Sequence, residues 1–214
     1  MKNRRWHVRV CAVVVCWLLA GFTGSASREK LPRIFVLPDA GALQAGDWIF
    51  RSGTSADSRL IKSLSQSRFS HIGIVVQTQP QVLIAHATTD DEPSQPNQVL
   101  ISTLAAFAAA EKADAVAVAR PRFLTAEQRA ASARYAAARK GQAFALAARE
   151  KNPFYCTTLL LDAIWKQAPA FAPQWQYLDV PVFRGEYLFP QAFLQADLDW
   201  VYAGTAQATV RPMR

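Results

Sequence analysis

One cysteine and two histidines are the side chains of this chain best suited to covalent chemistry. Cys156 stands in "NPFYCTTLLLDAIW", where apolar residues recur at helical spacing and predict a helix that begins close to the cysteine. His71 opens the apolar run "HIGIVV", and His86 lies near the end of "VLIAHA". A thiolate is a strong nucleophile, and an imidazole can take up the proton that a thiol loses. These residue types predict a cysteine hydrolase with a histidine as general base.

The expected position of Cys156 in the first turn of its helix favours an ionised thiol. Backbone N–H groups at a helix start carry partial positive charge, which stabilises a thiolate and can also stabilise an oxyanion. We interpret Asn152 as the helix cap and Pro153 as the first helical residue. The sequence thus predicts a thiol pKa well below the ordinary value. The alternative is an inert thiol buried in the apolar helix stripe.

The two histidines are expected on neighbouring strands. "HIGIVVQT" and "QVLIAHAT" have strand composition, and the turn signal "TQPQ" between them predicts a hairpin. Counted from that turn, residues 72–74 pair with residues 85–87, so His71 and His86 are cross-strand or diagonal neighbours whose rings can hydrogen-bond. A register shift of one residue would put the two rings on opposite faces of the sheet.

The hydrophobic pattern places other elements around this hairpin. Further strands are expected at 46–51, in "VLIS" and in "DAVAVARP", with helices at 55–67 and from Thr125 to Gly141. The polar segment 89–98 contains two prolines and is expected to be a loop. This order predicts an α+β domain in which an antiparallel β-sheet packs against helices.

The N-terminus has the layout of an export signal. "MKNRRWHVR" is basic, "VCAVVVCWLLAGF" is apolar and "TGSAS" supplies small residues. We expect removal of residues 1–26, followed by a lead-in at 27–44, a catalytic domain at 45–200 and a C-terminal tail at 201–214. The predicted location is the periplasm. An uncleaved membrane anchor is the alternative, although the apolar run is short for a membrane span.

Charge and cysteine content limit the classes of partner. Without residues 1–26 the chain keeps 188 residues, of which 20 are basic and 16 acidic, so its net charge is about +4 rather than +8. This modest, scattered charge argues against nucleic-acid binding. Cys156 is then the single cysteine and has no internal disulfide partner. One cysteine and two histidines match no compact zinc motif, so we predict neither a metal nor another cofactor.

Taken together, these segments resemble the circularly permuted NlpC-type papain-like proteins of the YiiX-like group. The resemblance rests on "GDWIFRSGTSADSRLIKSLSQSRFSHIGIVV", "VLIAHA" and "GQAF" followed by "NPFYCTTLLLDAIW", and it covers about residues 45–195. It implies a permuted papain-like domain in which the histidine precedes the cysteine. Ordinary papain-like enzymes have the reverse order.

The resemblance also implies a role for each matching residue. Cys156 takes the place of the nucleophile, His71 that of the base and His86 that of the third polar residue. Tyr155 matches the aromatic residue before the nucleophile, which lines the site or assists the oxyanion hole; simple packing is the alternative. Asp47 matches the aspartate of a "GD" turn, where a carboxylate caps backbone N–H groups.

Departures from the group's pattern leave the substrate open. Thr157 and Thr158 follow the cysteine where the group often has Ser-Glu, and Phe144 and Ala145 stand where Tyr-Asp is common. A histidine as third member is also similar to the lecithin-retinol-acyltransferase-like enzymes, which share the permuted order and use a His-His-Cys set. Lipid acyl chemistry is therefore the second reading that the resemblance implies.

We predict an exported cysteine amidase or peptidase that forms an acyl-enzyme on Cys156 and acts on cell-wall peptide or another amide. The first alternative is a lipid esterase or acyltransferase with the same three residues; the second is a non-catalytic binding module. We also expect peripheral association with the membrane or the cell wall, and the sequence indicates no oligomeric state. Aromatic residues of segment 169–190 could wall an acyl pocket: Phe171, Trp175, Tyr177, Phe183 and Tyr187.

Overall fold

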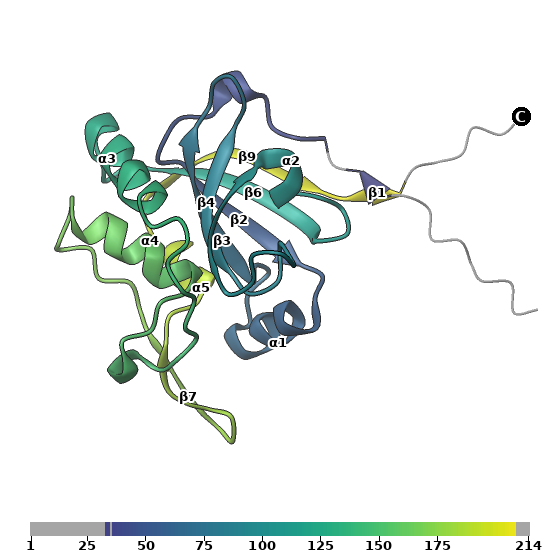
Figure 1. Ribbon diagram of the computed structural model, residues 1–214. Coiled ribbons are helices and arrows are strands. Elements are labelled where there is room, and N and C mark those ends of the chain that lie inside the picture. Colours follow the sequence, from purple (N-terminus) through teal and green to yellow (C-terminus); the bar gives the residue numbers. More distant parts are fainter. Residues whose placement is uncertain (1–32, 35, 209–214) are drawn as a thin grey trace, which may run out of the picture. The chain divides into compact units, whose positions relative to one another are not determined.

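Residues 33–34 and 36–208 are described by a computed structural model of the chain (Figure 1). The expected export signal at 1–26 lies outside these described residues. Within them, no helix is both long and apolar enough to cross a membrane.

A six-stranded antiparallel sheet is the framework, which confirms the predicted α+β class. Its strand order is β5-β4-β3-β2-β6-β9, and every neighbouring pair is antiparallel. Its members are β2 (Trp48–Gly53), β3 (His71–Gln77), β4 (Leu83–Thr88), β5 (Gln98–Thr103), β6 (Ala113–Pro121) and β9 (Leu198–Thr205). Two small sheets pair β1 (Arg33–Ile34) with β10 (Gln207–Ala208), and β7 (Gln176–Val180) with β8 (Phe183–Tyr187).

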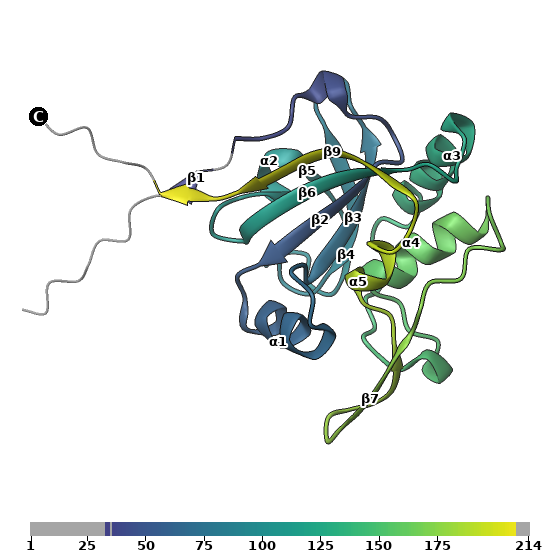
Figure 2. The same ribbon diagram turned by 180° about the vertical axis from the view of Figure 1, so that it is seen from behind.

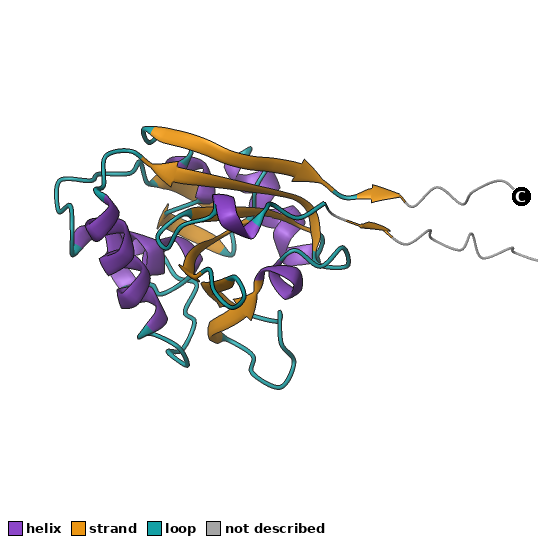
Figure 3. Ribbon diagram, turned by 90° about the horizontal axis from the view of Figure 1, so that it is seen from above, coloured by secondary structure: helices purple, strands orange, loops and turns teal. Residues whose placement is uncertain are grey.

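Helices and short 3-10 turns accompany the strands in the described part of the chain (Figure 3). The helices are α1 (Ala56–Ser65), α2 (Leu104–Phe107), α3 (Ala126–Ala137), α4 (Cys156–Trp165) and α5 (Pro190–Phe193), and the 3-10 turns are Ala40–Ala42 and Arg149–Lys151. Helices α3 and α4 pack together and lie against β3 and β4 (Figure 1). Figure 2 shows β9 running beside β6 when the molecule is viewed from behind.

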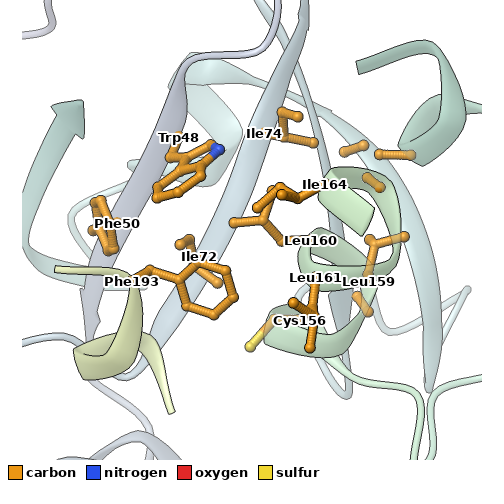
Figure 4. Close-up of a cluster of buried hydrophobic side chains, with 14 of the residues drawn as sticks. Trp48, Phe50, Ile72, Ile74, Cys156, Leu159, Leu160, Leu161, Ile164 and Phe193 are labelled. Atoms are coloured by element: carbon orange, nitrogen blue, oxygen red, sulfur yellow. The ribbon is translucent and has the colours of Figure 1, made fainter. Parts of the chain in front are cut away.

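Strand alternation divides the core between the two faces of the sheet. Trp48, Phe50, Ile72 and Ile74 are fully buried on the face that α4 covers (Figure 4). The intervening residues point the other way and pack with α2, and they include Ile49, Val75 and Ile84. Since successive side chains alternate, the odd-numbered residues of β2 and β3 belong to the α2 face. This fact decides where the histidines lie.

Helix starts were predicted well where a local cap determines them. Ser55 Oγ accepts the Ser58 N–H at 3.1 Å and begins α1, as its position indicated. Thr125 and Gln128 form the capping box that begins α3. Helix α3 ends at Ala137, before Gly141, where we expected it to stop. It ends early because the next residues turn towards Val99, whose carbonyl oxygen accepts the Gly141 N–H.

The predicted start of the nucleophile helix was wrong by three residues. Asn152 has φ of 51° and does not cap α4, and Pro153 lies outside the helix. Phe154 forms an antiparallel bridge with Ala145, which holds the chain extended until Tyr155. Cys156 is therefore itself the first helical residue, closer to the free N–H groups than the sequence suggested.

The last strand of the sheet extends beyond residue 200, where we expected the C-terminal tail to follow. Strand β9 continues to Thr205 and remains paired with β6 along its length. The expected tail therefore begins inside the sheet. At the other end, Leu43 of the expected lead-in is buried in the core of the α2 face.

Asp47 fixes the turn that enters β2. Its side chain is fully buried and accepts the Gln44 N–H at 2.8 Å, as expected for a turn aspartate. Both carboxylate oxygens also accept hydrogen bonds from Arg120, from Nε and NH2, each at 2.8 Å. Because Arg120 belongs to β6, this ion pair joins the turn to the strand that pairs with β2.

We expect Asp47→Ala to destabilise the fold by about 3 kcal/mol, since it leaves the arginine without its buried partner. Urea denaturation measures this change. The matched variant Asp197→Ala removes a carboxylate that is 65% exposed, so its cost should stay below about 0.5 kcal/mol. Equal losses for the two variants would contradict the structural role of Asp47.

Candidate active site

A cleft of about 410 Å³ contains both Cys156 and His71. It lies among the start of α4, the start of β3, α1, the loop after β4 and the segment that joins β8 to α5. The cleft also includes Arg51, Asp91 and Tyr155. The residues predicted from sequence to do chemistry thus share one concave site, which is the usual setting for a small-molecule or peptide substrate.

The two histidine rings are joined by a hydrogen bond. His71 Nε2 lies 2.9 Å from His86 Nδ1, and the rings meet edge to face. In the register, Ile74 pairs with Ala85, so His71 and His86 are diagonal neighbours on one face. This confirms the predicted hairpin geometry.

A glycine permits this close approach. A Cβ at Gly73 would lie 2.8 Å from Ile84 Cγ2, 3.0 Å from the Ala85 carbonyl oxygen and 3.2 Å from His86 Cβ. Any side chain at this position would therefore push β4 away from β3. The missing Cβ brings the second imidazole within reach of the first.

The contact that His86 makes on the side away from His71 determines which ring nitrogens of the two histidines carry protons. His86 Nε2 lies 2.9 Å from Ser102 Oγ of β5. If His71 is to accept a proton on Nδ1, its Nε2–H must donate to His86 Nδ1, and His86 Nε2–H must then donate to Ser102. The chain of contacts is consistent with this single tautomer assignment, which leaves one basic nitrogen on His71.

A buried ion pair lies beside the histidines. Arg51 is directly opposite His71 in the β2–β3 register. Its NH1 and NH2 donate to the two oxygens of Asp91 at 2.6 and 2.8 Å, and NH1 also donates to the Phe107 carbonyl oxygen. Asp91 Oδ2 is 3.8 Å from His86 Nδ1. The Phe107 ring packs against the guanidinium and both imidazoles, so it separates this polar group from the apolar core.

Burial keeps both histidines neutral. Loss of hydration lowers the pKa of His86 to about 3, even though the nearby Asp91 carboxylate acts in the opposite direction. Burial also lowers the pKa of His71 well below its ordinary value, and the positive charge of Arg51 adds to this shift. Burial alone would raise the pKa of Asp91, but its hydrogen bonds to Arg51 and the charge of that residue lower it well below the usual range.

Cys156 sits at the helix start as predicted, but its predicted acidity was wrong. Burial raises the pKa of the thiol to about 11, although backbone N–H groups of Ile72, Thr157 and Cys156 itself act to lower it. The sequence indicated the helix start but not how completely the sulfur is enclosed; the residue is only 9% exposed. The resting site therefore holds a neutral thiol and a neutral imidazole.

The predicted nucleophile and the predicted base come from opposite faces of the sheet. Cys156 belongs to the same core cluster on the α4 face as Ile72 (Figure 4). His71 alternates with Ile72 and faces α2. No hydrogen bond joins the sulfur to the His71 ring among the described residues, yet the sulfur approaches the backbone N–H of the next residue, Ile72. Catalytic hydrogen bonds are commonly long before substrate binds and shorten in the complex.

Tyr155 has a positioning role in this arrangement. Its hydroxyl accepts the Leu188 N–H at 2.8 Å, while Thr157 Oγ1 donates to the Leu188 carbonyl oxygen at 2.8 Å. Burial raises the pKa of Tyr155 above its ordinary value. Thr158 Oγ1 accepts the Tyr155 N–H at 2.8 Å and closes the first turn of α4. These contacts fix the residues on either side of the nucleophile.

Sequence reasoning missed four residues of the site: Arg51, Asp91, Ser102 and Phe107. Arg51 had a usable signal, because it directly follows the apolar residues 48–50 within β2. Asp91 had none, since it lies in a polar loop of the composition that exposed loops usually have.

The histidine pair and Asp91 are the described residues that come closest to a metal-ligand set. One ligand atom from each lies within 4.8 Å of the others. The arrangement does not fit a cation, however, because both Asp91 oxygens already bind the guanidinium of Arg51 and the facing imidazole nitrogens bind each other. Arg51 supplies the positive charge that a metal would otherwise bring.

Comparison with known proteins identifies the family and the fold. A family model described as "Permuted papain-like amidase enzyme, YaeF/YiiX, C92 family" matches residues 42–195. The crystal structure described as "metalloprotein yiiX from Escherichia coli O157:H7, DUF1105" superposes with a TM-score of 0.60 at 19% identity, covering 74% of this chain and 96% of that one. This likeness concerns the fold. No curated protein sequence matches the chain.

We expect Gly73→Ala to destabilise the protein by about 1–3 kcal/mol, because the added methyl group meets a backbone carbonyl that cannot move cheaply. Chemical denaturation of Gly73→Ala and Gly41→Ala provides a matched pair. A Cβ at Gly41 would make only ordinary contacts, the nearest at 3.4 Å to the Asp39 side chain. Equal losses of unfolding free energy for the two variants would show that Gly73 is not needed for the close approach of β3 and β4.

The neutral histidines also predict acid sensitivity. The unfolded chain takes up a proton at His86 as the pH falls below 6.5, whereas the folded chain resists until about pH 3. The free energy of unfolding is therefore highest above pH 6.5 and decreases as the pH falls through this window. His86 alone accounts for a decrease of about 2 kcal/mol between pH 7 and pH 5. Urea titrations at both pH values should show a smaller loss for His86→Gln. An unchanged loss would mean that His86 is not buried as a neutral ring.

Proposed function

Because the chain belongs to the permuted papain-like amidase family, we propose that it is a cysteine amidase that works through an acyl-enzyme on Cys156. The observation that carries the proposal is the shared cleft, which includes a free thiol at the first residue of a helix and an imidazole positioned by a second imidazole. Papain-like hydrolase chemistry requires this combination of nucleophile and oriented base.

The neutral resting state determines how the first step proceeds. A thiol with a pKa of about 11 is not ionised at neutral pH, so His71 removes its proton as the sulfur attacks the carbonyl carbon. The proton enters at Nδ1, because Nε2 is engaged with His86. The backbone N–H groups at the start of α4 are the proposed donors to the oxyanion.

The second half of the reaction uses the same groups in reverse. The His71 imidazolium donates its proton to the departing amine, and the carbon–nitrogen bond breaks to leave a thioester on Cys156. Water, activated by the neutral imidazole, then hydrolyses the thioester. Throughout the reaction, His86 Nδ1 accepts a hydrogen bond from His71 Nε2–H and so keeps the ring of His71 in one orientation.

No metal takes part in this proposal. The word metalloprotein describes the Escherichia coli protein, and in this chain Arg51 holds the carboxylate that a metal would need. Export to the periplasm and association with the cell wall or membrane stay proposals that rest on the N-terminal sequence. Cell-wall peptide is one amide that would suit that compartment.

The proposal predicts that Cys156→Ala and His71→Ala each reduce amide hydrolysis by at least about 1,000-fold. Release of aminomethylcoumarin from a panel of acyl amides measures the rate, with Asp197→Asn as an exposed control. Activity that survives in Cys156→Ala would end the proposal.

Alkylation by iodoacetamide tests the resting state of the thiol separately. Because its pKa is about 11, the rate at Cys156 should still rise above pH 9, where an ordinary thiol levels off. Peptide mapping separates Cys156 from Cys11 and Cys16. A rate that levels off below pH 7 would instead indicate a preformed ion pair.

A further inference from the structure

A groove of about 340 Å³ lies over β6 and β9, at the opposite end of the strand order from β5. Its other lining residues come from the turn between α1 and β3 and from the residue that follows α5. None of them lines the cleft that contains Cys156. The groove is therefore a second concave site, of a size that suits a small ligand.

Small side chains on β6 and β9 leave this space open. The register places Ile72, Phe50, Ala117 and Ala203 in one row across β3, β2, β6 and β9. Directly paired residues point to the same face of a sheet, and on this face Ile72 and Phe50 are fully buried. The row then continues with only a methyl group on each of the last two strands, while α3 and α4 lie against β3 and β4. An apolar part of a ligand can occupy the space that larger side chains fill elsewhere in the row.

Two aromatic rings flank the hollow. Phe69 and Trp200 line the groove, and both pack on Phe50, with ring centroids at 5.5 and 6.0 Å. Figure 4 shows Phe50 at the side of the buried cluster away from the α4 side chains. Trp200 keeps 54% of its surface exposed, so a ligand that covered its ring would remove a large apolar area from water.

The polar side-chain groups in the groove are hydrogen-bond donors. Arg68 is exposed and, among the described residues, forms no hydrogen bond and no ion pair; its guanidinium lies 5.7 Å from the centre of the Phe69 ring. The indole N–H of Trp200 likewise has no acceptor in the part of the chain that the structure describes. No described carboxylate lines the groove. Because a guanidinium binds a carboxylate through two parallel hydrogen bonds, these donors favour an anionic ligand.

We propose that the groove binds a small amphiphilic carboxylate. Its apolar part lies over Ala117 and Ala203, between the rings of Phe69 and Trp200, and its carboxylate binds Arg68. An uncharged apolar ligand would leave the guanidinium unused, and a cation would be repelled by it. Binding here involves no step of the cysteine chemistry, so this inference is independent of the proposed function.

Three related probes separate the two parts of the proposed ligand. Phenylbutyrate has both parts, phenylbutyramide keeps the ring without the charge, and butyrate keeps the charge without the ring. By isothermal titration calorimetry of the full chain, we expect a Kd below about 1 mM for phenylbutyrate. The affinity for each of the other two probes should be at least about 10-fold lower, because each probe loses one set of contacts.

The variant Arg68→Gln tests the charge. It should weaken phenylbutyrate binding about 10-fold and leave phenylbutyramide binding unchanged, because the amide makes no use of the positive charge. Added salt should likewise weaken binding of the carboxylate alone. Arg134→Gln removes an exposed arginine of α3 that lies outside the groove, so this matched control should change neither affinity.

The variant Ala203→Leu tests the location. Its larger side chain fills the hollow and should weaken phenylbutyrate binding at least about 10-fold. Because Ala203 is exposed, the fold should persist, which circular dichroism checks. Thr205→Leu places the same side chain on the same face of β9, two residues along and outside the groove, and should leave the affinity unchanged.

The signal of the Trp200 indole N–H gives a direct readout of the site. In proton–nitrogen correlation NMR spectra, phenylbutyrate should shift this signal, which is identified by its loss in Trp200→Phe. Equal affinities for the three probes, a Trp200 signal that does not move, or affinities that Arg68→Gln and Ala203→Leu leave unchanged would overturn the inference. A dimer in sedimentation velocity that excludes the probes and that Ala203→Leu dissociates would also overturn it, because the groove would then bind a second copy of the chain.

Discussion

A 2.9 Å hydrogen bond between two buried imidazole rings is the interaction on which the rest of the site depends. It fixes the orientation of His71 and reserves one ring nitrogen for chemistry. Two features of the sheet make it possible: the diagonal register of β3 and β4, and the missing Cβ of Gly73 between them. Ser102 on β5 completes the arrangement, so three neighbouring strands hold a single base.

Charge around this pair is balanced inside the protein rather than by solvent. A carboxylate beside a buried imidazole would normally favour the imidazolium. Here Arg51 binds that carboxylate with both terminal nitrogens, and burial then decides the protonation state. The same positive charge favours the thiolate of Cys156. Arg51 thus disfavours the imidazolium of His71 and favours the thiolate of Cys156. When a proton passes from Cys156 to His71, the two effects oppose each other.

Much of the fold followed from local signals in the sequence. The turn between β3 and β4 set the register of the histidines, and the cap residues of α1 and α3 marked their first turns. The start of α4 was misplaced because a distant bridge between Ala145 and Phe154, rather than a local cap, holds the chain extended there.

The electrostatic features of the site had no comparable signal. Arg51 and Asp91 are 40 residues apart, and their pairing depends on how the loop after β4 folds back over β2. The acidity of Cys156 depends on burial by several elements, which no spacing of residues encodes.

For the single thiol outside the N-terminal segment, this enclosure has a chemical benefit. Peroxides and disulfides react with thiolates far faster than with protonated thiols. A sulfur that ionises only as it attacks is therefore shielded from oxidation between turnovers.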